Sequence, residues 1–393
     1  MKLLRERQAQ EDTALLDAAW SAPETFVLLP EKLGVTDEWL AAAGACLPAA
    51  LRADHFAMLT SGTTGKPKLV LGNRVRSERL AAVLHEKQDS AAVAETILLL
   101  PLSYTYAFVN QWLWARTQGR RLIATDGLSD PAALGTTFSS AKNAMLCLVG
   151  VQVPLLLIHL AGKEFPGVIR IHFAGGRFPQ ERLSDLRGLF PNAAIFNNYG
   201  CAEAMPRLTL RRADEADDAA NIGRPLPGVE LQSGADHALK FRSPYGAVGV
   251  VEDGCFAAIA PGDWTPTGDL GEPLADGSWR LLGRASEVFK RHGEKVSLHA
   301  LTTTVTAAWP GQCAFYRERD VSGEDGCVLT LAPTADAAAL REVQLALRRH
   351  HPRAQWPLRI EAVDSLPLLS NGKPDVRSLA IMPGKSILWH QHI

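Results

Sequence analysis

Short apolar runs alternate with amphipathic segments through the first half of the chain. Strand patterns occur at residues 56–59, 69–71, 96–100, 121–124, 145–149, 169–173 and 194–196. Helical spacing of apolar residues occurs at 3–20, 38–51 and 77–85. Because strands and helices take turns along the sequence, we predict an α/β fold with a largely parallel sheet. Ligands of such sheets bind at the carboxyl ends of the strands.

From about residue 223 the pattern changes to short β-rich pieces that glycine and proline separate. Predicted strands lie at residues 230–231, 239–241, 248–252 and 279–282. We expect them to form a small β-barrel-like subdomain over residues 223–283. Beyond it, helical patterns at 298–309 and 337–350 mix with strand patterns at 328–331 and 358–363. The sequence therefore predicts a large domain over residues 1–283 and a small α+β domain over residues 284–393.

The composition argues against several classes of protein. The 393 residues suffice for two or three domains with a substantial core. Because 41 basic residues balance 42 acidic ones, without a long run of one sign, a nucleic-acid partner is not expected. The six cysteines lack C-x-x-C spacing, which favours reduced thiols in a cytoplasmic protein over disulfides or a zinc site.

Two segments bear on secretion and on membranes. Residues 1–8 become polar before an apolar signal region could develop, so we do not expect secretion. Residues 144–161 are strongly apolar but contain Gly150, Gln152 and Pro154. They therefore predict a buried strand followed by a helix that begins near Pro154, and no membrane span.

The most distinctive segment directly follows a predicted strand. It reads Ser61-Gly62-Thr63-Thr64-Gly65-Lys66-Pro67-Lys68. Glycines let backbone N–H groups approach phosphate oxygens, while the hydroxyl groups and Lys68 add donors and positive charge, so the segment suits a polyphosphate. It is not a Walker A loop, because Pro67 stands where that loop requires serine or threonine. An ordinary surface turn can have the same composition, so this segment alone decides nothing.

Four further segments follow this loop along the chain. They are Tyr199-Gly200-Cys201-Ala202-Glu203, Thr267-Gly268-Asp269, the run 283–296 and Ser370-Asn371-Gly372-Lys373. Taken singly, each also fits ordinary structure, such as a strand-end tyrosine or the tip of a hairpin. In this order, the five segments resemble the motifs of the superfamily of adenylate-forming enzymes. That superfamily comprises acyl-CoA synthetases, adenylation domains of nonribosomal peptide synthetases and luciferases, and the resemblance covers residues 56–373.

The resemblance implies an ATP site. Its residues would be Ser61, Gly62, Thr63, Thr64, Gly65, Lys68, Gly175, Gly176, Asn198, Tyr199, Gly200, Asp269 and Arg284. Tyr199 would stack on adenine, and Asp269 would accept hydrogen bonds from both ribose hydroxyls, because a carboxylate only accepts. Glu203 would bind Mg²⁺ between the phosphates, since this cation with phosphate ligands needs few protein carboxylates.

The resemblance also implies a two-step reaction and a mobile C-terminal domain. Lys373 would steady a carboxylic acid as it attacks the α-phosphate of ATP, which leaves an acyl-adenylate and pyrophosphate. The C-terminal domain would then pivot near residues 284–287 and exchange Lys373 for Lys290 in the site. Ser286 stands at the pivot, where the family usually has aspartate or lysine. The segment before the phosphate loop and the C-terminal domain both look shorter than is usual in the family.

The predicted acid pocket is aromatic. Tyr104, Tyr106 and Phe108 alternate in the segment where the family binds its acid, with Gly150 and Val151 opposite. The segment has no acidic residue, and a buried ammonium group without a partner would be costly, so amino acids are disfavoured as substrates. Aryl, unsaturated or medium-chain acyl acids are favoured instead. Alternatively, these rings simply belong to the core, which is the commoner fate of aromatic residues.

The acceptor of the acyl group stays open. A thiol of coenzyme A, or of the phosphopantetheine arm of an acyl carrier protein, would make the chain an acid–thiol ligase with ATP and Mg²⁺ as cofactors. One alternative is an amide synthetase with an amine acceptor. Another is a catalytically weakened nucleotide-binding protein with a regulatory role, which the shortened first domain and Ser286 favour. Intact Lys373, Glu203 and Asp269 argue against that role.

Overall fold

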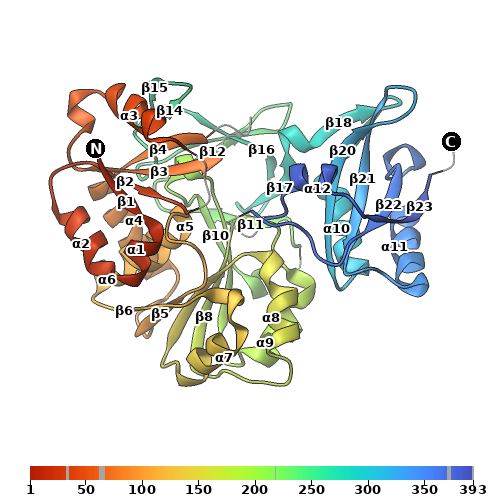
Figure 1. Ribbon diagram of the computed structural model, residues 1–393, viewed down its shortest axis with the longest axis horizontal. Helices are drawn as coiled ribbons and strands as arrows, with labels where there is room; N and C mark the ends of the chain where they lie inside the picture. Colours follow the sequence, from red (N-terminus) through yellow and green to blue (C-terminus); the bar gives the residue numbers. More distant parts are fainter. Residues whose placement is uncertain (32–34, 62–66, 217, 370–372, 392–393) are drawn as a thin grey trace.

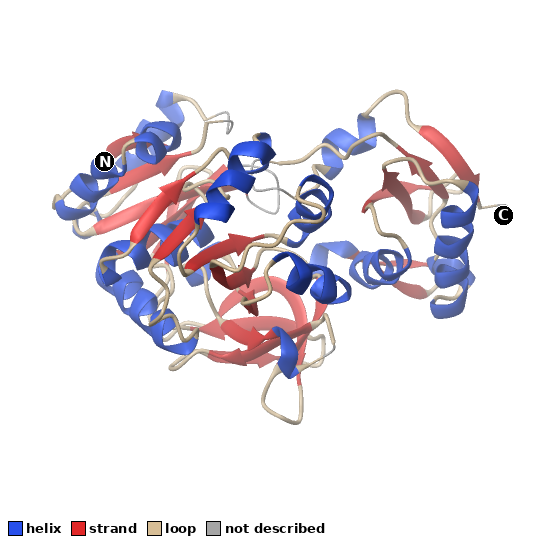
Figure 2. Cartoon of the chain, turned by 90° about the horizontal axis from the view of Figure 1, so that it is seen from below, coloured by secondary structure: helices blue, strands red, loops and turns tan. Residues whose placement is uncertain are grey.

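The computed structural model describes residues 1–31, 35–61, 67–216, 218–369 and 373–391, without the side chain of Ser61. Figure 1 shows a large N-terminal part with two β-sheets and a smaller C-terminal part on the side of the molecule opposite the N-terminus. Figure 2 shows the same division from a second direction. The two parts are joined after β17 (Trp279–Arg284) by a short 3₁₀ turn, Ala285–Glu287.

Six strands form the first sheet. In order across the sheet they are β1 (Lys2–Arg5), β2 (Phe26–Leu29), β3 (His55–Ser61), β4 (Pro67–Asn73), β14 (Gly249–Glu252) and β15 (Cys255–Ala258). Successive side chains of a strand point to opposite faces, so Phe26 and Phe56 pack into one core while Val27 and Ala57 pack into another. Burial on both faces explains why β2 and residues 56–59 of β3 are continuously apolar.

Eleven strands form the second sheet. In order they are β6 (Arg121–Ala124), β5 (Glu95–Leu98), β7 (Ala144–Leu148), β8 (Val168–Phe173), β9 (Ala194–Tyr199), β10 (Thr209–Arg212), β11 (Asn221–Pro225), β17, β16 (Thr265–Pro273), β13 (Ala238–Arg242) and β12 (Glu230–Ser233). Pairing is parallel from β6 to β9 and antiparallel from β9 to β12. The β-rich region thus continues the α/β sheet, apart from β14 and β15, which extend the first sheet.

Helices cover both faces of the parallel strands. Those of the N-terminal part are α1 (Glu6–Glu11), α2 (Thr13–Ser21), α3 (Asp37–Ala45), α4 (Arg74–Lys87), α5 (Thr105–Ala107), α6 (Trp114–Gln118), α7 (Pro131–Ser140), α8 (Val153–His159) and α9 (Leu183–Leu189). Residues of α2 and α4 share one core with both sheets, whereas α7, α8 and α9 pack on the other face of the second sheet. A six-residue π-helix, Phe108–Leu113, separates α5 from α6.

The C-terminal part has a small sheet between helices. Its elements are the hairpin β18 (Val288–Arg291) and β19 (Glu294–Ser297), strands β20 (Gln312–Arg319), β21 (Asp325–Ala332), β22 (Arg359–Ala362) and β23 (Ser386–His390), and helices α10 (Leu298–Ala308), α11 (Ala337–His350) and α12 (Val376–Ile381). Leu301 of α10 and Val343 of α11 pack with Leu329 on one face of the sheet. Leu379 of α12 packs with Val328 on the other face.

The structure corrects the predicted helix at residues 3–20. Lys2–Arg5 forms β1, which pairs with β2 in parallel, and the helices begin only at Glu6. The Asp12 side chain then accepts a hydrogen bond from the Ala14 N–H and caps α2. Strand β2 was not predicted at all. A four-residue apolar run gives no periodicity, and its burial comes from the neighbouring strands β1 and β3, which lie far from it in sequence.

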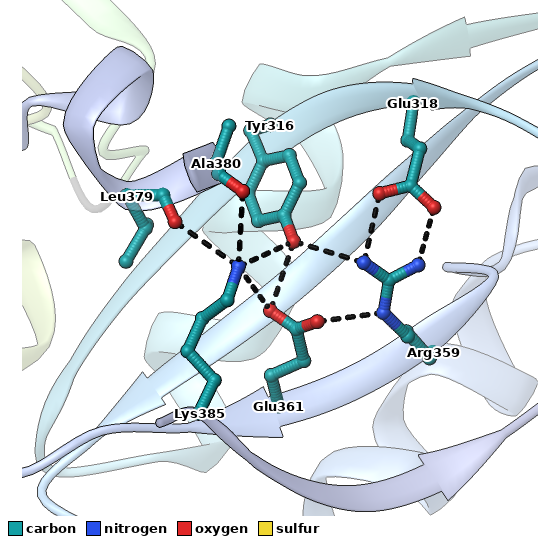
Figure 3. Close-up of polar contacts among 7 residues, drawn as sticks. All are labelled: Tyr316, Glu318, Arg359, Glu361, Leu379, Ala380 and Lys385. Carbon is teal, nitrogen blue, oxygen red and sulfur yellow. Dashed lines mark hydrogen bonds and ion pairs between the residues drawn. The ribbon is translucent and has the colours of Figure 1, made fainter. Parts of the chain in front are cut away.

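A network of charged side chains ties α12 to the small sheet (Figure 3). Lys385 donates to the hydroxyl of Tyr316 at 2.9 Å and to the Leu379 carbonyl at 3.0 Å, and it lies 3.0 Å from Glu361 Oε2. Glu361 is only 3% exposed and also binds Arg359 Nε at 2.6 Å. Since α12 begins three residues after Lys373, this network fixes the segment that carries that lysine.

We expect Lys385→Met to lower the stability of the protein by about 1–3 kcal/mol, because it leaves buried acceptors without their charged donor. The measurement is chemical denaturation followed by circular dichroism. The matched control is Arg7→Met, which removes an ion pair to Glu11 whose side chains are 76% and 65% exposed. The control should have the smaller effect. Equal effects of the two substitutions would contradict a structural role for the network.

Candidate active site

A cleft of about 260 Å³ opens between the two sheets and the C-terminal part. Lys68, Tyr104, Glu203, Thr267, Arg284 and Lys373 are among the residues that line it. These residues are far apart in the sequence and come from all five motif segments and from the aromatic segment. The fold therefore brings residues from every motif segment to one place.

Lys68 and Glu203 form an ion pair at one wall of the cleft. Lys68 lies on β4, and Glu203 lies in the 3₁₀ turn Ala202–Ala204 that follows β9. Their side chains are 17% and 18% exposed, so both reach the cleft from a largely buried position. Gly200 precedes this turn, and a Cβ there would lie 1.9 Å from the Pro206 carbonyl oxygen. Only glycine therefore allows the chain to double back and present Glu203.

Three side chains meet at Asp269, from β16 itself, from the neighbouring β17 and from the end of β9. Asp269 of β16 pairs directly with Arg284 of β17, and Arg284 Nε lies 3.2 Å from Asp269 Oδ1. The Tyr199 hydroxyl, at the end of β9, donates to Asp269 Oδ2 at 2.7 Å. The Thr267 hydroxyl accepts a hydrogen bond from the Asp269 N–H at 3.1 Å and so fixes the turn. Burial, with Asp269 beside it, raises the pKa of Tyr199 well above its usual value, so the phenol stays a donor.

Lys373 reaches the cleft from the C-terminal part. Burial, followed by the charge of Arg284, lowers the pKa of Lys373 to about 8, while Asp269 and Glu287 oppose the shift. Burial conversely raises the pKa of Glu287. The ammonium group of Lys373 is thus surrounded by other charged groups. It loses its proton at about pH 8, below the usual range of a lysine.

If protonated Lys373 promotes adenylation, kcat/KM of that step should fall as the pH rises through about 8, where the free enzyme loses the proton. The measurement is acid-dependent pyrophosphate exchange between pH 6 and 10. Lys373→Arg keeps its charge throughout this range and should lack the fall. A wild-type profile that stays flat up to pH 10 would contradict the role of the ammonium.

The aromatic segment contributes two of its three predicted rings. Tyr104 and Tyr106 line the cleft, and a Cβ on Gly175, which has φ +77°, would lie 2.6 Å from the Tyr104 hydroxyl. Burial raises the pKa of Tyr104 to about 12. Phe108 does not reach the cleft. It is fully buried and stacks on Phe56 with ring centroids 5.0 Å apart, so for this ring the alternative of a core residue is correct.

Gly150 and Val151 lie at a neighbouring cavity and not opposite Tyr104 in the cleft. This cavity of about 120 Å³ lies between the N-terminal part and α10, and Gly176 and Lys373 also line it. Gly175 borders both spaces. The two cavities therefore meet beside Gly175 and Lys373.

The other predicted residues take different places. Asn198 is buried and donates to the Phe173 carbonyl at 3.0 Å, so it joins β9 to β8 and does not line the cleft. Ser286 is exposed in the turn Ala285–Glu287, and Lys290 is exposed on the β18–β19 hairpin, away from the residues that line the cleft. Gly62, Thr63, Thr64 and Gly65 lie outside the described residues, as does the side chain of Ser61. The ends of that loop are the paired residues Ser61 and Pro67.

Sequence reasoning missed two side chains of the site. Thr267 belongs to the Thr-Gly-Asp motif, so its position in that motif could have revealed it. Glu287 follows the predicted pivot and acts electrostatically on Lys373, which is distant in sequence, and no sequence signal points to that proximity. Among the described residues, we find no group of three or more His, Cys, Asp or Glu side chains suited to hold a metal ion. Every described helix is too short or too polar to cross a bilayer.

A sequence model of the family described as AMP-binding enzyme matches residues 4–241, more than half of the chain. The protein belongs to this family. The resemblance to adenylate-forming enzymes is thereby confirmed, as is the α/β fold class. The matched region contains the phosphate loop, the Tyr-Gly-x-x-Glu segment and the aromatic segment.

Curated relatives of this AMP-binding enzyme are much longer proteins. Tyrocidine synthase 3 of Brevibacillus parabrevis is 24% identical over 370 residues, which is 86% of this chain and 6% of that protein. The non-ribosomal peptide synthetase CmlP of Streptomyces venezuelae is 28% identical over 347 residues, which is 82% of this chain and 34% of that protein. The chain thus spans about a third or less of the length of these relatives.

Solved structures share the fold over almost the whole AMP-binding enzyme. An o-succinylbenzoate CoA synthetase of Bacillus subtilis with its acyl-adenylate intermediate has a TM-score of 0.73 at 16% identity, covering 98% of this chain and 88% of that one. The anthranilate CoA ligase AuaEII in complex with anthranoyl-AMP has a TM-score of 0.72 at 17% identity, and the match covers 96% of this chain and 77% of that one. The amide bond synthetase McbA of Marinactinospora thermotolerans has a TM-score of 0.69 at 19% identity, and the match covers 97% of this chain and 79% of that one. At these identities the likeness concerns the fold alone.

Proposed function

We propose that this enzyme uses ATP to activate a carboxylic acid as an acyl-adenylate, releases pyrophosphate, and transfers the acyl group to a thiol. One observation carries the proposal: Lys373 lines a cleft together with the Lys68–Glu203 pair and Arg284, and Arg284 is in turn paired with Asp269. Cations and acceptors suited to a triphosphate and to a ribose thus surround a single space.

Each pair suits one part of ATP. Asp269 offers carboxylate oxygens to the ribose hydroxyls, and Arg284 neutralises charge beside them. In this proposal Tyr199, which ends β9 and donates to Asp269, stacks on adenine, and Lys68 binds the β- and γ-phosphates. Because these groups are held before ATP arrives, they can position the α-phosphate for in-line attack without reorganisation.

Glu203 fits the Mg²⁺ that normally accompanies ATP. It is one carboxylate at the phosphate side of the cleft, and Mg²⁺ with phosphate ligands takes one or two carboxylates and keeps several waters. When bound, the cation neutralises charge on the phosphates. The ammonium group of Lys68, beside Glu203, would bind phosphate oxygens directly.

Lys373 is placed to bind the attacking carboxylate and the α-phosphate together. A carboxylate and a phosphate repel each other, and an ammonium group between them offsets this repulsion as charge builds in the transition state. Attack forms a C(=O)–O–P bond and breaks the bond from the α-phosphorus to the pyrophosphate oxygen. The products are the acyl-adenylate and pyrophosphate.

For the second step we favour a thiol acceptor, on coenzyme A or on a carrier protein. The cavity between Gly176 and α10 leads to Lys373 from the side of the C-terminal part and offers a route for a narrow acceptor arm. A pivot at Ser286 would withdraw Lys373 and bring Lys290 toward the adenylate. The thiol sulfur then attacks the acyl carbon, and AMP leaves. The alternative is that an amine, and not a thiol, accepts the acyl group, as the name of the amide bond synthetase McbA suggests for that enzyme.

The deciding experiment measures pyrophosphate release from ATP with a panel of aryl, unsaturated and medium-chain acids. We expect at least one acid to stimulate release, and we expect coenzyme A or a holo carrier protein, rather than an amine, to accelerate turnover. Acid-dependent release with amines as the only effective acceptors would make the enzyme an amide synthetase. Failure of every acid would contradict the proposal and favour a nucleotide-binding protein.

A further inference from the structure

A fully buried arginine lies behind the wall of the cleft where the acid pocket is expected. Arg207 follows Pro206, which lines the cleft, and Arg207 itself is only 1% exposed. Its Nη2 donates to Asn110 Oδ1, while Nε and Nη1 have no hydrogen-bond partner among the described residues. Within the described part of the chain, no carboxylate forms an ion pair with it. A buried cation without a counter-ion is costly, so this position calls for an explanation.

The neighbours of Arg207 are polar but neutral. Cys147 of β7 pairs with His172 of β8, and both are fully buried. Burial raises the pKa of Cys147 to about 12, which keeps its thiol protonated. Burial, with Arg207 and Arg170 nearby, lowers the pKa of His172 well below its usual value, so the imidazole is uncharged, and both its nitrogens lack partners among the described residues. Neither group can serve as the counter-ion.

Tyr106 separates this guanidinium from the cleft. Arg207 Cζ lies 4.9 Å from the centroid of the Tyr106 ring, and the same ring lines the cleft. The Tyr106 hydroxyl is buried and interacts electrostatically with Cys147 and Arg207, but it makes no hydrogen bond of good geometry to the described residues. Asn110, the partner of Arg207, lies in the π-helix Phe108–Leu113, an irregularity that is typical of functional sites. A single side chain thus stands between the ligand space and an uncompensated positive charge.

We propose that Arg207 selects acids that carry a second carboxylate at the end distant from the activated one. This inference rests on the proposed function. The guanidinium is the side chain best suited to a buried carboxylate, which would supply the missing negative charge and accept hydrogen bonds from the unpartnered nitrogen. Rotation of the Tyr106 side chain opens the way from the cleft, and the Tyr106 hydroxyl then has an acceptor as well. The substrate class is therefore a dicarboxylic acid, which narrows the acids considered above.

The test compares each dicarboxylic acid with its own monomethyl ester in the pyrophosphate-exchange assay. Terephthalate, isophthalate, 4-carboxycinnamate and glutarate cover aromatic, unsaturated and flexible spacers. Each ester keeps the carboxylate that is activated and loses only the distant charge. For at least one pair, kcat/KM of the wild type should be about tenfold or more higher for the diacid, as expected when a hydrogen bond to a charged group is gained.

Two variants assign this preference to a residue. Arg207→Gln should bring the diacid-to-ester ratio close to one, and because the ratio is measured within one protein, partial loss of folded enzyme does not affect it. The matched control is Arg211→Gln, since Arg211 is also a buried arginine but hydrogen-bonds Gln180 and the Ala216 carbonyl and packs on Phe178. This control should keep the wild-type ratio.

The outcomes separate this inference from the proposed function. The proposed selection by Arg207 would be overturned if the wild type used diacids and their esters equally. It would also be overturned if only acids without a second carboxylate were active. Acid activation itself would stand in both cases. An unchanged ratio in Arg207→Gln would likewise overturn this selection. Failure of every acid to release pyrophosphate would overturn both. If Arg207→Gln does not fold, equal use of each diacid and its ester by the wild type would still overturn the inference.

Discussion

Replacing Lys373 with alanine should reduce acid-dependent pyrophosphate exchange by about 100- to 1000-fold, the usual cost of removing one group that stabilises transition-state charge. The side chain lines the cleft, and nothing else from the C-terminal part supplies a cation there among the residues described as lining it. The same variant should capture a supplied acyl-adenylate with a thiol at nearly the wild-type rate. This asymmetry arises because the second step forms no bond to phosphorus.

The matched variant is Lys290→Ala. Lys290 is exposed on the β18–β19 hairpin, outside the cleft, so its removal should leave pyrophosphate exchange intact and slow the thiol step. Single-turnover assays of the two half-reactions measure both variants. Equal losses in the two steps for either variant would contradict a C-terminal part that alternates between two positions.

Asp269→Asn should lower kcat/KM for ATP by about 10- to 100-fold, because a hydrogen bond to a charged acceptor contributes about 1.5–3 kcal/mol. Asparagine keeps the shape of the side chain but removes the charge that faces Arg284 at 3.2 Å. The decisive readout is the discrimination between ATP and 2′-deoxy-ATP. The wild type should prefer ATP, and the variant should lose most of this preference.

Tyr199→Phe serves as the control for Asp269→Asn. It removes the hydroxyl that donates to Asp269 Oδ2 but leaves the carboxylate in place. We expect this variant to keep the preference for ATP over 2′-deoxy-ATP. If it loses the preference as fully as Asp269→Asn does, the carboxylate acts through Tyr199 and does not bind the ribose directly.

The sequence predicted the fold class and several of the residues that line the cleft, for a physical reason. Strands β5, β7, β8 and β9 are buried on both faces, so they appear as apolar runs, and the functional segments follow directly where such runs end. Tyr199 and Glu203 follow β9 in this way, and Gly175 follows β8. Local sequence patterns were therefore sufficient to predict those site residues whose position depends only on where a strand ends.

The remaining features depend on contacts between distant segments. Phe108 lies two residues after Tyr106, but the segment is helical from Thr105 onward. Residues two apart in a helix do not share a face, and Phe108 packs in the core against Phe56. Nothing near Arg207 in sequence shows that it is buried without a counter-ion. Strands β14 and β15 join the first sheet through the pairing of β14 with β4, which no local pattern specifies. Register and packing between distant segments decide such positions.

The proposed reaction depends on attack by the acid at the α-phosphate of ATP. Transfer of an oxygen isotope from the acid to AMP tests this attack most directly. The enzyme is supplied with ATP, a thiol and a substrate acid whose carboxylate carries ¹⁸O in both positions. We predict that AMP gains one ¹⁸O atom and pyrophosphate gains none, because the adenylate oxygen comes from the acid and stays with phosphorus when the thiol attacks the acyl carbon. Label in inorganic phosphate or pyrophosphate, or unlabelled AMP from a turning-over enzyme, would contradict it.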